Sequence, residues 1–446
     1  GPVVVHVLTK KGRGYEPASA HPDRFHGTGP FDIKTGKVLQ KKTVPGYTDV
    51  FSKALVSLAE KNKKLTAITA AMPDGTGLVE FSKRFPERFF DVGIAEEHAV
   101  SFAAGLALGG LVPVVAIYSS FLQRAVDQML HDVCMQKLHV IFAIDRAGLV
   151  GADGETHQGC FDLSYLSMMP NMTVLAPKND KELADMLAFA VDYDGPVAIR
   201  YPRGSAYQGL QEYQAPVEYG KSEIIHRGKK IAVLGVGSMI PSCLEVCQGL
   251  KADGYDPTFV NARFVKPLDV DLLDEFAKDH NLFVTVEENV KSGGYGEHVS
   301  AYMEACHPET RVLSAAVWDR FVPQGSVDSL RNRIGLGVED IRQARRDELD
   351  AYNMEIARLK REARQLVNEK DAEIPDEDED RERSRIFLEV EAIDAEDDVK
   401  EKKKQEKQGK KLTDNIFVIM GVGILVVAII MIIVRLVGFQ KSIQQL

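Results

Sequence analysis

The sequence contains few cysteines and no excess of positive charge. Its 446 residues include 5 cysteines, none of them in a CxxC pair, which excludes a disulfide scaffold. The 55 basic side chains are outnumbered by 65 acidic ones, and the formal net charge of -10 argues against a protein that coats nucleic-acid phosphates. We therefore expect buried free thiols, a reducing compartment and no nucleic-acid partner.

Apolar residues are plentiful, at 45% of the chain, so disorder of the whole chain is excluded as well. The length allows two or three domains. Up to about residue 335, strand-like runs alternate with amphipathic helical stretches, which predicts α/β domains with parallel sheets. Strands are expected at 65–68, 112–117, 139–144 and 173–175, a helix at 181–191, and a second unit from about 210 that opens with a strand, a turn and a helix after residue 231.

The first residues resemble the end of a domain more than its beginning. The chain starts with Gly1 rather than Met, and residues 1–8 are typical of a buried strand. We expect that an N-terminal portion is missing and that residues 1–42 are its last strand and a linker.

The composition changes after about residue 340. Apolar residues at heptad spacing within 341–370 cover fewer than three repeats, so a lone amphipathic helix and a coiled coil both remain open. Residues 371–411 are densely charged and predict a solvated tether. No charge occurs from Ile416 to Val434, and seven lysines precede that run. We expect one transmembrane helix at 414–437, which would anchor a cytoplasmic catalytic region to the lipid bilayer.

Polar side chains gather at the ends of three successive expected strands. Glu96 follows the first, Tyr118 and Arg124 follow the second, and Arg146 with the segment 151–159 follows the third. Parallel α/β sheets keep their chemistry at these strand ends. Arginines in such places suit a phosphorylated or carboxylated substrate.

These segments closely resemble the 1-deoxy-D-xylulose-5-phosphate synthases, transketolase-like enzymes that depend on thiamine diphosphate. The resemblance covers residues 1 to about 340, and the tail has no counterpart in it. The motifs that carry it are Thr9–Ala18, Phe25-His26-Gly27, Ile94-Ala95-Glu96, Tyr118–Arg124, Gly151–Gly159, Arg200–Gly204 and Arg263–Asp269.

The resemblance implies a fold and a reaction. The fold is a transketolase-like pyrimidine-binding domain at 43–208 and a transketolase C-terminal domain at 209–340, in a homodimer. The reaction condenses pyruvate with D-glyceraldehyde 3-phosphate, with loss of carbon dioxide, and its product feeds isoprenoid, thiamine and pyridoxal synthesis.

It also implies site residues. Glu96 matches the carboxylate that hydrogen-bonds the aminopyrimidine ring of the cofactor, and Tyr15 matches a tyrosine that contacts the cofactor. The remaining matches are the active-site histidines and the substrate pocket, which comprise His26, His157, Tyr118, Arg124, Arg146, Asp153 and Arg203. Two alternatives stay open: Arg124 as a surface helix residue, and Arg146 as a structural partner of Asp145.

The sequence departs from the family in one respect. The family holds magnesium and the diphosphate through a Gly-Asp-Gly segment and a downstream Asn in an N-terminal domain, and no such segment occurs here. We expect the magnesium ligands in the missing domain, no metal ligands in this chain, and no synthase activity from this chain alone.

Three other interpretations remain. The chain could be the beta subunit of a two-chain thiamine-dependent oxo-acid dehydrogenase, although the Tyr15 segment argues against this. It could be a non-catalytic, tail-anchored scaffold, although the retained Glu96 and His157 argue against decay. The tail after about 345 could also be an artefact of joined genes.

Overall fold

The computed structural model describes residues 1–22, 25, 28–39 and 44–344. His26, the predicted tether and the predicted membrane span at 414–437 lie outside the described residues. Among the residues that are described, no helix combines the length and the apolar character that a bilayer crossing requires.

The chain divides into two compact units. Residues 1–247 and 257–341 form the larger unit, which contains both sheets and the candidate site. The described part of the second unit is 248–256 with 342–344, where Arg342 Nη2 lies 2.9 Å from Asp253 Oδ2.

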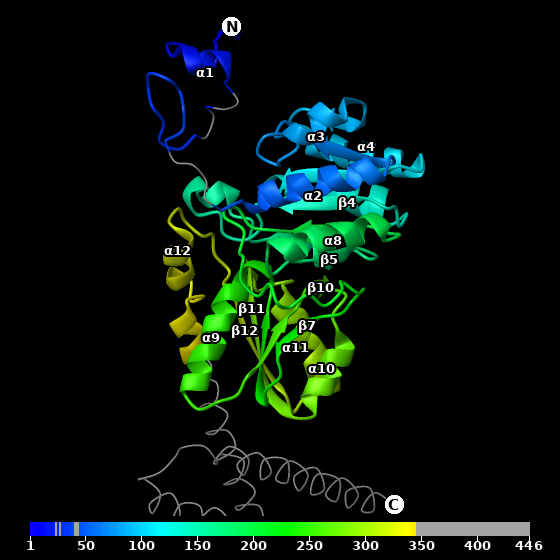
Figure 1. The fold of residues 1–446 in the computed structure, drawn as a ribbon, viewed down its shortest axis with the longest axis vertical. Helices are drawn as coiled ribbons and strands as arrows, with labels where there is room; N and C mark the ends of the chain where they lie inside the picture. Colours follow the sequence, from blue (N-terminus) through cyan, green and yellow to red (C-terminus); the bar gives the residue numbers. More distant parts are fainter. Residues whose placement is uncertain (23–24, 26–27, 40–43, 345–446) are drawn as a thin grey trace, which may run out of the picture. The chain divides into compact units, whose positions relative to one another are not determined.

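A seven-stranded sheet forms the first half of the larger unit, in the order β10-β5-β6-β4-β3-β1-β2 (Figure 1). All neighbouring strands are parallel except β10, which runs antiparallel to β5. Helices cover both faces, so the central strands are apolar throughout. The strands are β1 (Leu65–Thr69), β2 (Phe89–Asp91), β3 (Val112–Tyr118), β4 (Ile141–Asp145), β5 (Thr173–Leu175), β6 (Val197–Arg200) and β10 (Phe264–Lys266).

Alternation along the strands produces two separate hydrophobic layers. In β1, Leu65 and Ala67 pack in the layer of α2 (Tyr47–Lys61), α3 (Val79–Arg84) and α8 (Asp180–Asp192). Ile68 packs in the opposite layer, with α4 (Glu96–Leu108), α7 (Asp162–Ser167) and the π-helix η3 (Met129–Cys134). In Figure 1, α2 and α8 lie side by side on the same face of the sheet.

Capping side chains fix where two of these helices begin. The Asn179 side chain accepts a hydrogen bond from Glu182 N at 2.9 Å and so caps α8. The Asp49 carboxylate of α2 accepts a hydrogen bond from Gly46 N at 2.7 Å. Each contact gives a hydrogen-bond acceptor to a backbone N–H group at or near the start of a helix.

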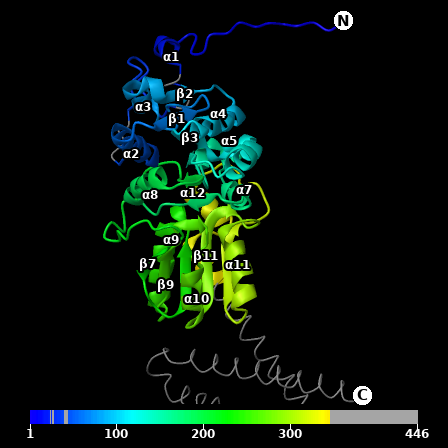
Figure 2. The ribbon, with the colours of Figure 1, turned by 90° about the vertical axis from the view of Figure 1, so that its right-hand side faces the viewer.

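A five-stranded sheet forms the second half, in the order β12-β11-β8-β9-β7, with only β7 antiparallel to its neighbour (Figure 2). Its strands are β7 (Glu223–His226), β8 (Lys230–Gly235), β9 (Thr258–Asn261), β11 (His280–Val290) and β12 (Arg311–Val317). Its helices are α9 (Ile240–Ala252), α10 (Val270–Ala277), α11 (Tyr295–Cys306) and α12 (Val327–Arg333). The short helices of the chain are α1 (Glu16–Ala20), α5 (Ser119–Leu122), α6 (Val126–Gln128), η1 (Pro86–Arg88), η2 (Gln123–Ala125), η4 (Gly151–Asp153), η5 (Glu155–His157) and η6 (Gly237–Met239).

The two halves share one core. Strand β10 follows β9 in the chain but pairs with β5 of the seven-stranded sheet. One hydrophobic cluster runs from α4 and β3 through Val265 of β10 to α10 and α11. The packing of each half therefore depends on the other.

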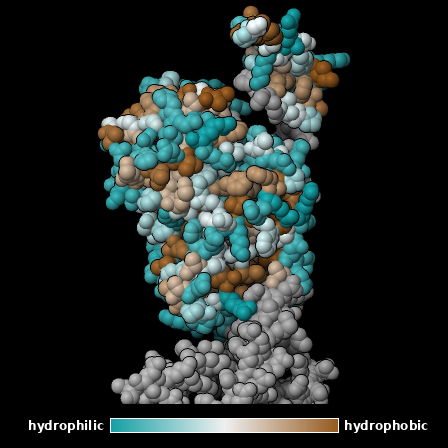
Figure 3. All heavy atoms as spheres, turned by 180° about the vertical axis from the view of Figure 1, so that it is seen from behind, coloured by the Kyte–Doolittle hydropathy of each residue, from teal (hydrophilic) through white to brown (hydrophobic). Residues whose placement is uncertain are grey.

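The fold confirms the predicted α/β class with its largely parallel sheets, and the expected strands from 65 to 175 are present. Cys134, Cys160, Cys243 and Cys247 are buried free thiols, as expected, whereas Cys306 is exposed. The strand expected at residues 1–8 is not formed: Val4 is 94% exposed. No other strand pairs with this segment among the described residues, so its apolar side chains are not covered. Elsewhere on the surface, Figure 3 shows hydrophobic residues in several separate patches among hydrophilic ones.

Candidate functional site

The site lies at the carboxyl ends of adjacent parallel strands. Tyr118 is the last residue of β3, Asp145 is the last residue of β4, and the two are partners in the sheet register. Glu96 begins α4, just after β2. The sheet thus brings together side chains that are 22 or more positions apart in the sequence.

Glu96 is a buried carboxylate with one oxygen engaged. Only 2% of the residue is exposed, and its Oε1 accepts a hydrogen bond from Arg124 Nη1 at 3.2 Å. A carboxylate offers several lone pairs, so Glu96 retains acceptor capacity beyond the bond from Arg124. Glu96 is the first residue of α4, so its carboxylate lies near the positive end of the helix dipole. The carboxylate can therefore accept one further hydrogen bond.

Tyr118 and Arg146 form a stacked pair. The Arg146 guanidinium lies 3.7 Å from the centre of the Tyr118 ring, and its Nη1 donates to Gly75 O at 2.8 Å. A Cβ on Gly75 would overlap the Tyr118 hydroxyl, so only glycine fits there. Burial raises the pKa of Tyr118 to about 12. The phenol therefore keeps its proton near neutral pH and can donate a hydrogen bond.

The Asp145 carboxylate forms an ion pair with Arg146. Its Oδ1 lies 3.0 Å from Arg146 Nη1, and its Oδ2 accepts a hydrogen bond from Thr48 Oγ1 at 2.8 Å. Burial raises the pKa of Asp145 to about 6, against the opposing effects of Arg146 and Thr48. Arg146 has a left-handed backbone (φ 60°), a conformation that costs energy for a residue with a side chain. The structural pairing of Arg146 with Asp145 is thus present together with its contact to Tyr118.

Phe121 connects the predicted residues. Its ring stacks on Tyr118 with centres 5.5 Å apart, and it meets the His157 ring edge-on at 5.4 Å. The Arg124 guanidinium lies 5.6 Å from the same ring. Through Phe121, five predicted residues form one contact chain, which we call the Phe121 cluster: Glu96, Arg124, Tyr118, Arg146 and His157.

Asp153 and Arg203 form a second group beside that cluster. Arg203 Nε lies 3.3 Å from Asp153 Oδ2, and both side chains are partly exposed. Asp153 shares the loop 148–159 with His157, and the loop is closed at its base by Gly148 and Gly159, which exchange two backbone hydrogen bonds of 2.7 and 2.8 Å. Asp153 of the second group and His157 of the Phe121 cluster therefore lie in the same closed loop.

Two predicted residues are not brought to this cluster by any described contact. Tyr15 packs against Phe25 and Phe31 and donates a hydrogen bond to Ile33 O at 2.9 Å, all within the N-terminal segment. His26 lies outside the described residues. Phe121, Gly75 and Thr48 are the residues that sequence reasoning missed. Phe121 lies within the motif Tyr118–Arg124, and an aromatic residue so close to Tyr118 could have indicated a ring contact.

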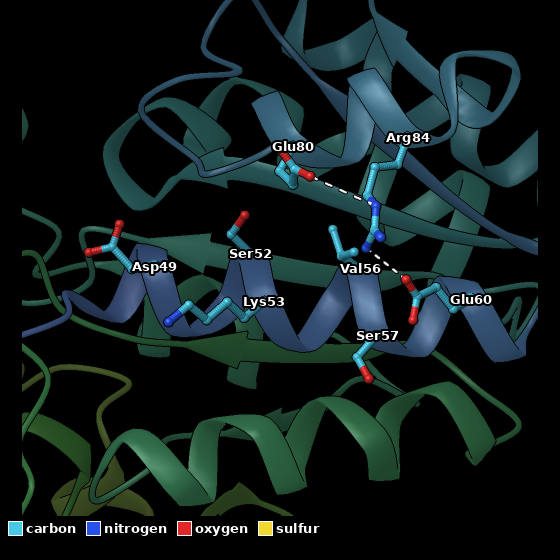
Figure 4. Close-up of a pocket in the computed structure, with 8 residues that line it drawn as sticks. All are labelled: Asp49, Ser52, Lys53, Val56, Ser57, Glu60, Glu80 and Arg84. Atoms are coloured by element: carbon cyan, nitrogen blue, oxygen red, sulfur yellow. Dashed lines mark ion pairs between the residues drawn. The ribbon is translucent and has the colours of Figure 1, made fainter.

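A pocket borders the Asp153–Arg203 group. It has a volume of about 550 Å³ and is lined from both halves of the fold, with Arg203 and Leu149 on one side and Ser238, Glu288 and Arg331 on the other. A second pocket, of about 430 Å³, lies between α2 and α3 (Figure 4). There Arg84 pairs with Glu60 at 2.7 Å and with Glu80 at 3.8 Å, and no predicted site residue lines it.

No set of three or more histidine, cysteine, aspartate or glutamate side chains is arranged to hold a metal ion within the part of the chain that is described.

Comparison with known proteins identifies the two halves separately. Residues 44–208 match the family described as "Transketolase, pyrimidine binding domain", and residues 220–341 match "Transketolase, C-terminal domain". A solved structure titled "Split gene transketolase, inactive beta4 tetramer" is 30% identical, with a TM-score of 0.61, and the match covers 67% of this chain and 96% of that one.

Curated relatives are more similar in sequence. The 1-deoxy-D-xylulose-5-phosphate synthase of Lachnoclostridium phytofermentans is 54% identical over 342 residues, which is 76% of this chain and 55% of the relative. The synthase of Aquifex aeolicus is 50% identical over 349 residues, which is 78% of this chain and 56% of the relative. The chain thus spans about half the length of the curated relatives it matches.

Proposed function

Since this chain belongs to the transketolase family, we propose that it forms the substrate-handling part of a 1-deoxy-D-xylulose-5-phosphate synthase. The reaction joins pyruvate to D-glyceraldehyde 3-phosphate with loss of carbon dioxide. The observation that carries the proposal is the Phe121 cluster, which places a buried carboxylate, a phenol, two arginines and a histidine in one contact chain.

The donor set at Glu96 fits thiamine diphosphate. A buried carboxylate with one oxygen held by Arg124 can accept a hydrogen bond from the protonated ring nitrogen of an aminopyrimidine. When bound, the cofactor supplies a carbanion for attack on a carbonyl and an electron sink for decarboxylation. Glu96 orients that ring and moves its proton, and Arg124 holds the Glu96 side chain in place.

The other residues act on the substrates. Tyr118 remains a hydrogen-bond donor because its pKa is raised to about 12, and Arg146 holds its ring by stacking. His157, whose ring contacts Phe121, exchanges a proton with a substrate oxygen. Arg146 and Arg203 each pair with an aspartate, but the Arg203 side chain is 42% exposed while that of Arg146 is 17% exposed, so Arg203 is the phosphate anchor.

Several further assignments complete the proposal. Tyr15 and His26 contact the cofactor and substrate from the segment before residue 43. Magnesium is held together with the diphosphate by an N-terminal diphosphate-binding domain, and the protein is a homodimer. The pyrimidine-binding domain extends over 43–208 and the C-terminal domain over 209–340.

We also propose that the segment 414–437 spans the bilayer, with the catalytic region in the cytoplasm. The support is the uncharged run 416–434 and the lysines that precede it. Alkaline carbonate extraction of cells that express the full chain, or a chain ending at Lys411, tests this. Only the full chain is expected in the membrane pellet, and a full chain that stays in the supernatant without aggregation contradicts the proposal.

The test of the activity supplies everything the reaction requires. The protein is mixed with the diphosphate-binding domain of the Lachnoclostridium relative, thiamine diphosphate, magnesium, pyruvate and D-glyceraldehyde 3-phosphate. We expect carbon dioxide and 1-deoxy-D-xylulose 5-phosphate in equal amounts. Carbon dioxide release that instead requires lipoamide as acyl acceptor identifies an oxo-acid dehydrogenase subunit, and no release at all leaves the scaffold interpretation.

A further inference from the structure

The loop 148–159 has little regular structure to hold its own shape. It carries Asp153 and His157 on two short 3-10 turns, and Gly148, Gly151 and Gly154 all have a left-handed backbone. Within the loop, Val150 N donates to Gln158 Oε1 at 2.8 Å. A loop of this kind keeps one conformation only when surrounding groups fix it.

Those surrounding groups belong to the C-terminal half of the fold. Glu288 Oε2, at the end of β11, accepts a hydrogen bond from Leu149 N at 3.3 Å. At the other end of the loop, Gln158 Nε2 donates to Pro323 O at 3.0 Å. Next to the loop, Val290 N donates to Cys160 O at 2.8 Å. Gly325 N also donates to Gly151 O at 3.4 Å. The loop and the residue after it are therefore tied to the end of β11 and to the segment that follows β12.

Glu288 makes the charged one of these contacts. It is 1% exposed, and its Oε1 lies 2.7 Å from Arg331 Nε of α12. Its Oε2 also accepts a hydrogen bond from Ser238 Oγ at 2.9 Å. A Cβ on Gly148 would overlap Glu288 Oε2, so the carboxylate lies directly against the first residue of the loop. Arg331 supplies the counter-charge that a buried carboxylate needs.

The contact reaches the substrate groups in two short steps. Glu288 fixes Leu149, and the next residue, Val150, accepts a hydrogen bond from Arg203 Nη1 at 3.3 Å. Arg203 in turn pairs with Asp153 of the same loop. The position of the Arg203 guanidinium thus depends on where Glu288 holds the base of the loop.

We propose that Glu288, held by Arg331, is a positioning residue: across the boundary between the two halves, it sets the loop that carries Asp153 and His157 and the arginine that binds the acceptor phosphate. The effect on substrates rests on the proposed function, and the placement of the loop does not. The C-terminal half therefore takes part in recognition of the phosphorylated acceptor without touching it.

The test compares Glu288→Gln with Glu182→Gln. Glu182 is a matched control, because it is likewise buried (2% exposed) and likewise joins the two halves through an arginine, Arg263, at 2.7 Å. Its hydrogen bonds go to Lys178, Asn179, Asn261 and Arg263 rather than to the loop. Glutamine keeps the shape of either carboxylate and removes its charge. Backbone amide exchange by mass spectrometry and steady-state kinetics are measured on both variants of the full chain, the kinetics with the diphosphate-binding domain supplied.

For Glu288→Gln we expect amides of 149–159 to exchange about tenfold faster or more, because a hydrogen bond to a buried charged acceptor is weakened. The KM for D-glyceraldehyde 3-phosphate should rise about tenfold, while the KM for pyruvate stays within twofold. Glu182→Gln, which disturbs a buried network away from the loop, should leave the acceptor KM unchanged and should not speed exchange of the loop amides more than exchange of the rest of the fold. Glu288→Asp, which keeps the charge, should recover part of the loss.

Gly148→Ala perturbs the same contact from the loop side and keeps the test decisive if Glu288→Gln does not fold. Its added methyl should displace the loop base and give the same faster exchange over 149–159. The proposal is overturned if loop exchange stays at the parent rate in the folded variants, or if Glu182→Gln changes it equally. Failure of the proposed function looks different: the parent protein forms no product, while the exchange result still decides the role of Glu288.

Discussion

Removal of Lys178 should destabilise the fold far more than removal of a surface charge. Lys178 Nζ lies 3.0 Å from Glu182 Oε1 and 2.7 Å from Glu223 Oε2, and Arg263 reaches the same two carboxylates at 2.7 and 2.9 Å. All four side chains are at most 4% exposed. They form a neutral group of two cations and two anions, and they join α8 to the strands β7 and β9 of the other half.

Lys178→Met leaves two buried carboxylates with one cation. Breaking a buried pair in this way typically costs about 3 to 5 kcal/mol, because the remaining charge is neither solvated nor compensated. For the larger unit, residues 1–247 with 257–341, that corresponds to a fall of roughly 4 to 7 °C in Tm. The uncompensated carboxylate can lose its charge only by taking up a proton, so the loss of unfolding free energy should be smaller at pH 5 than at pH 8.

Urea unfolding followed by circular dichroism measures both effects. The control is Arg84→Met, which removes the half-exposed pair with Glu60 at 2.7 Å (Figure 4). An exposed pair of this kind contributes about 0 to 1 kcal/mol. If Lys178→Met loses no more unfolding free energy than Arg84→Met, or if its deficit is independent of pH, the buried network does not join the two halves as described.

Three further predictions concern the site. Because the pKa of Asp145 rises from 3.8 to about 6 on folding, this group lowers the unfolding free energy by about 3 kcal/mol as the pH increases through that window. Asp145→Asn should remove this pH dependence from unfolding free energies measured between pH 4 and 7, and equal slopes in the two proteins would contradict the burial argument. Gly75→Ala should displace the Tyr118 ring and cost about 1 to 3 kcal/mol in unfolding free energy. Gly105→Ala, where an added Cβ meets nothing, should not destabilise the fold, and equal unfolding free energies of the two variants would mean that the surroundings of Gly75 can relax. Arg203→Met should raise the KM for D-glyceraldehyde 3-phosphate by about 10-fold to 100-fold and change the KM for pyruvate less, as expected for loss of a charged hydrogen bond, and an equal rise in both constants would remove Arg203 from the phosphate site.

Periodicity predicts most of the fold because buried parallel strands and amphipathic helices leave strong local patterns. The strands β1, β3, β4 and β5 were expected close to where they occur. Strand β10 could not be expected in the same way. Its three residues follow β9 of one sheet but pair with β5 of the other, and nothing local in Phe264–Lys266 specifies that distant partner.

The candidate site divides in a similar manner. Glu96, Tyr118, Arg124 and Arg146 were recognisable because they lie in long motifs at strand ends. The residues that hold them were not. Thr48 reaches Asp145 across 97 positions of sequence, and Glu288 reaches Leu149 across 139. Such contacts depend on how separate elements pack, which a local pattern does not encode.

We propose that Glu96 performs the acid–base work of a thiamine-dependent synthase. The most direct test is the rate of product formation by Glu96→Gln, with the diphosphate-binding domain supplied and folding checked by circular dichroism. The glutamine keeps the shape of the side chain but cannot carry the proton, and general acid–base groups contribute about a hundredfold to ten-thousandfold. We expect the rate of product formation to fall by a factor in that range while the variant remains folded. A variant within about threefold of the parent, which corresponds to roughly 0.65 kcal/mol of barrier, would contradict it.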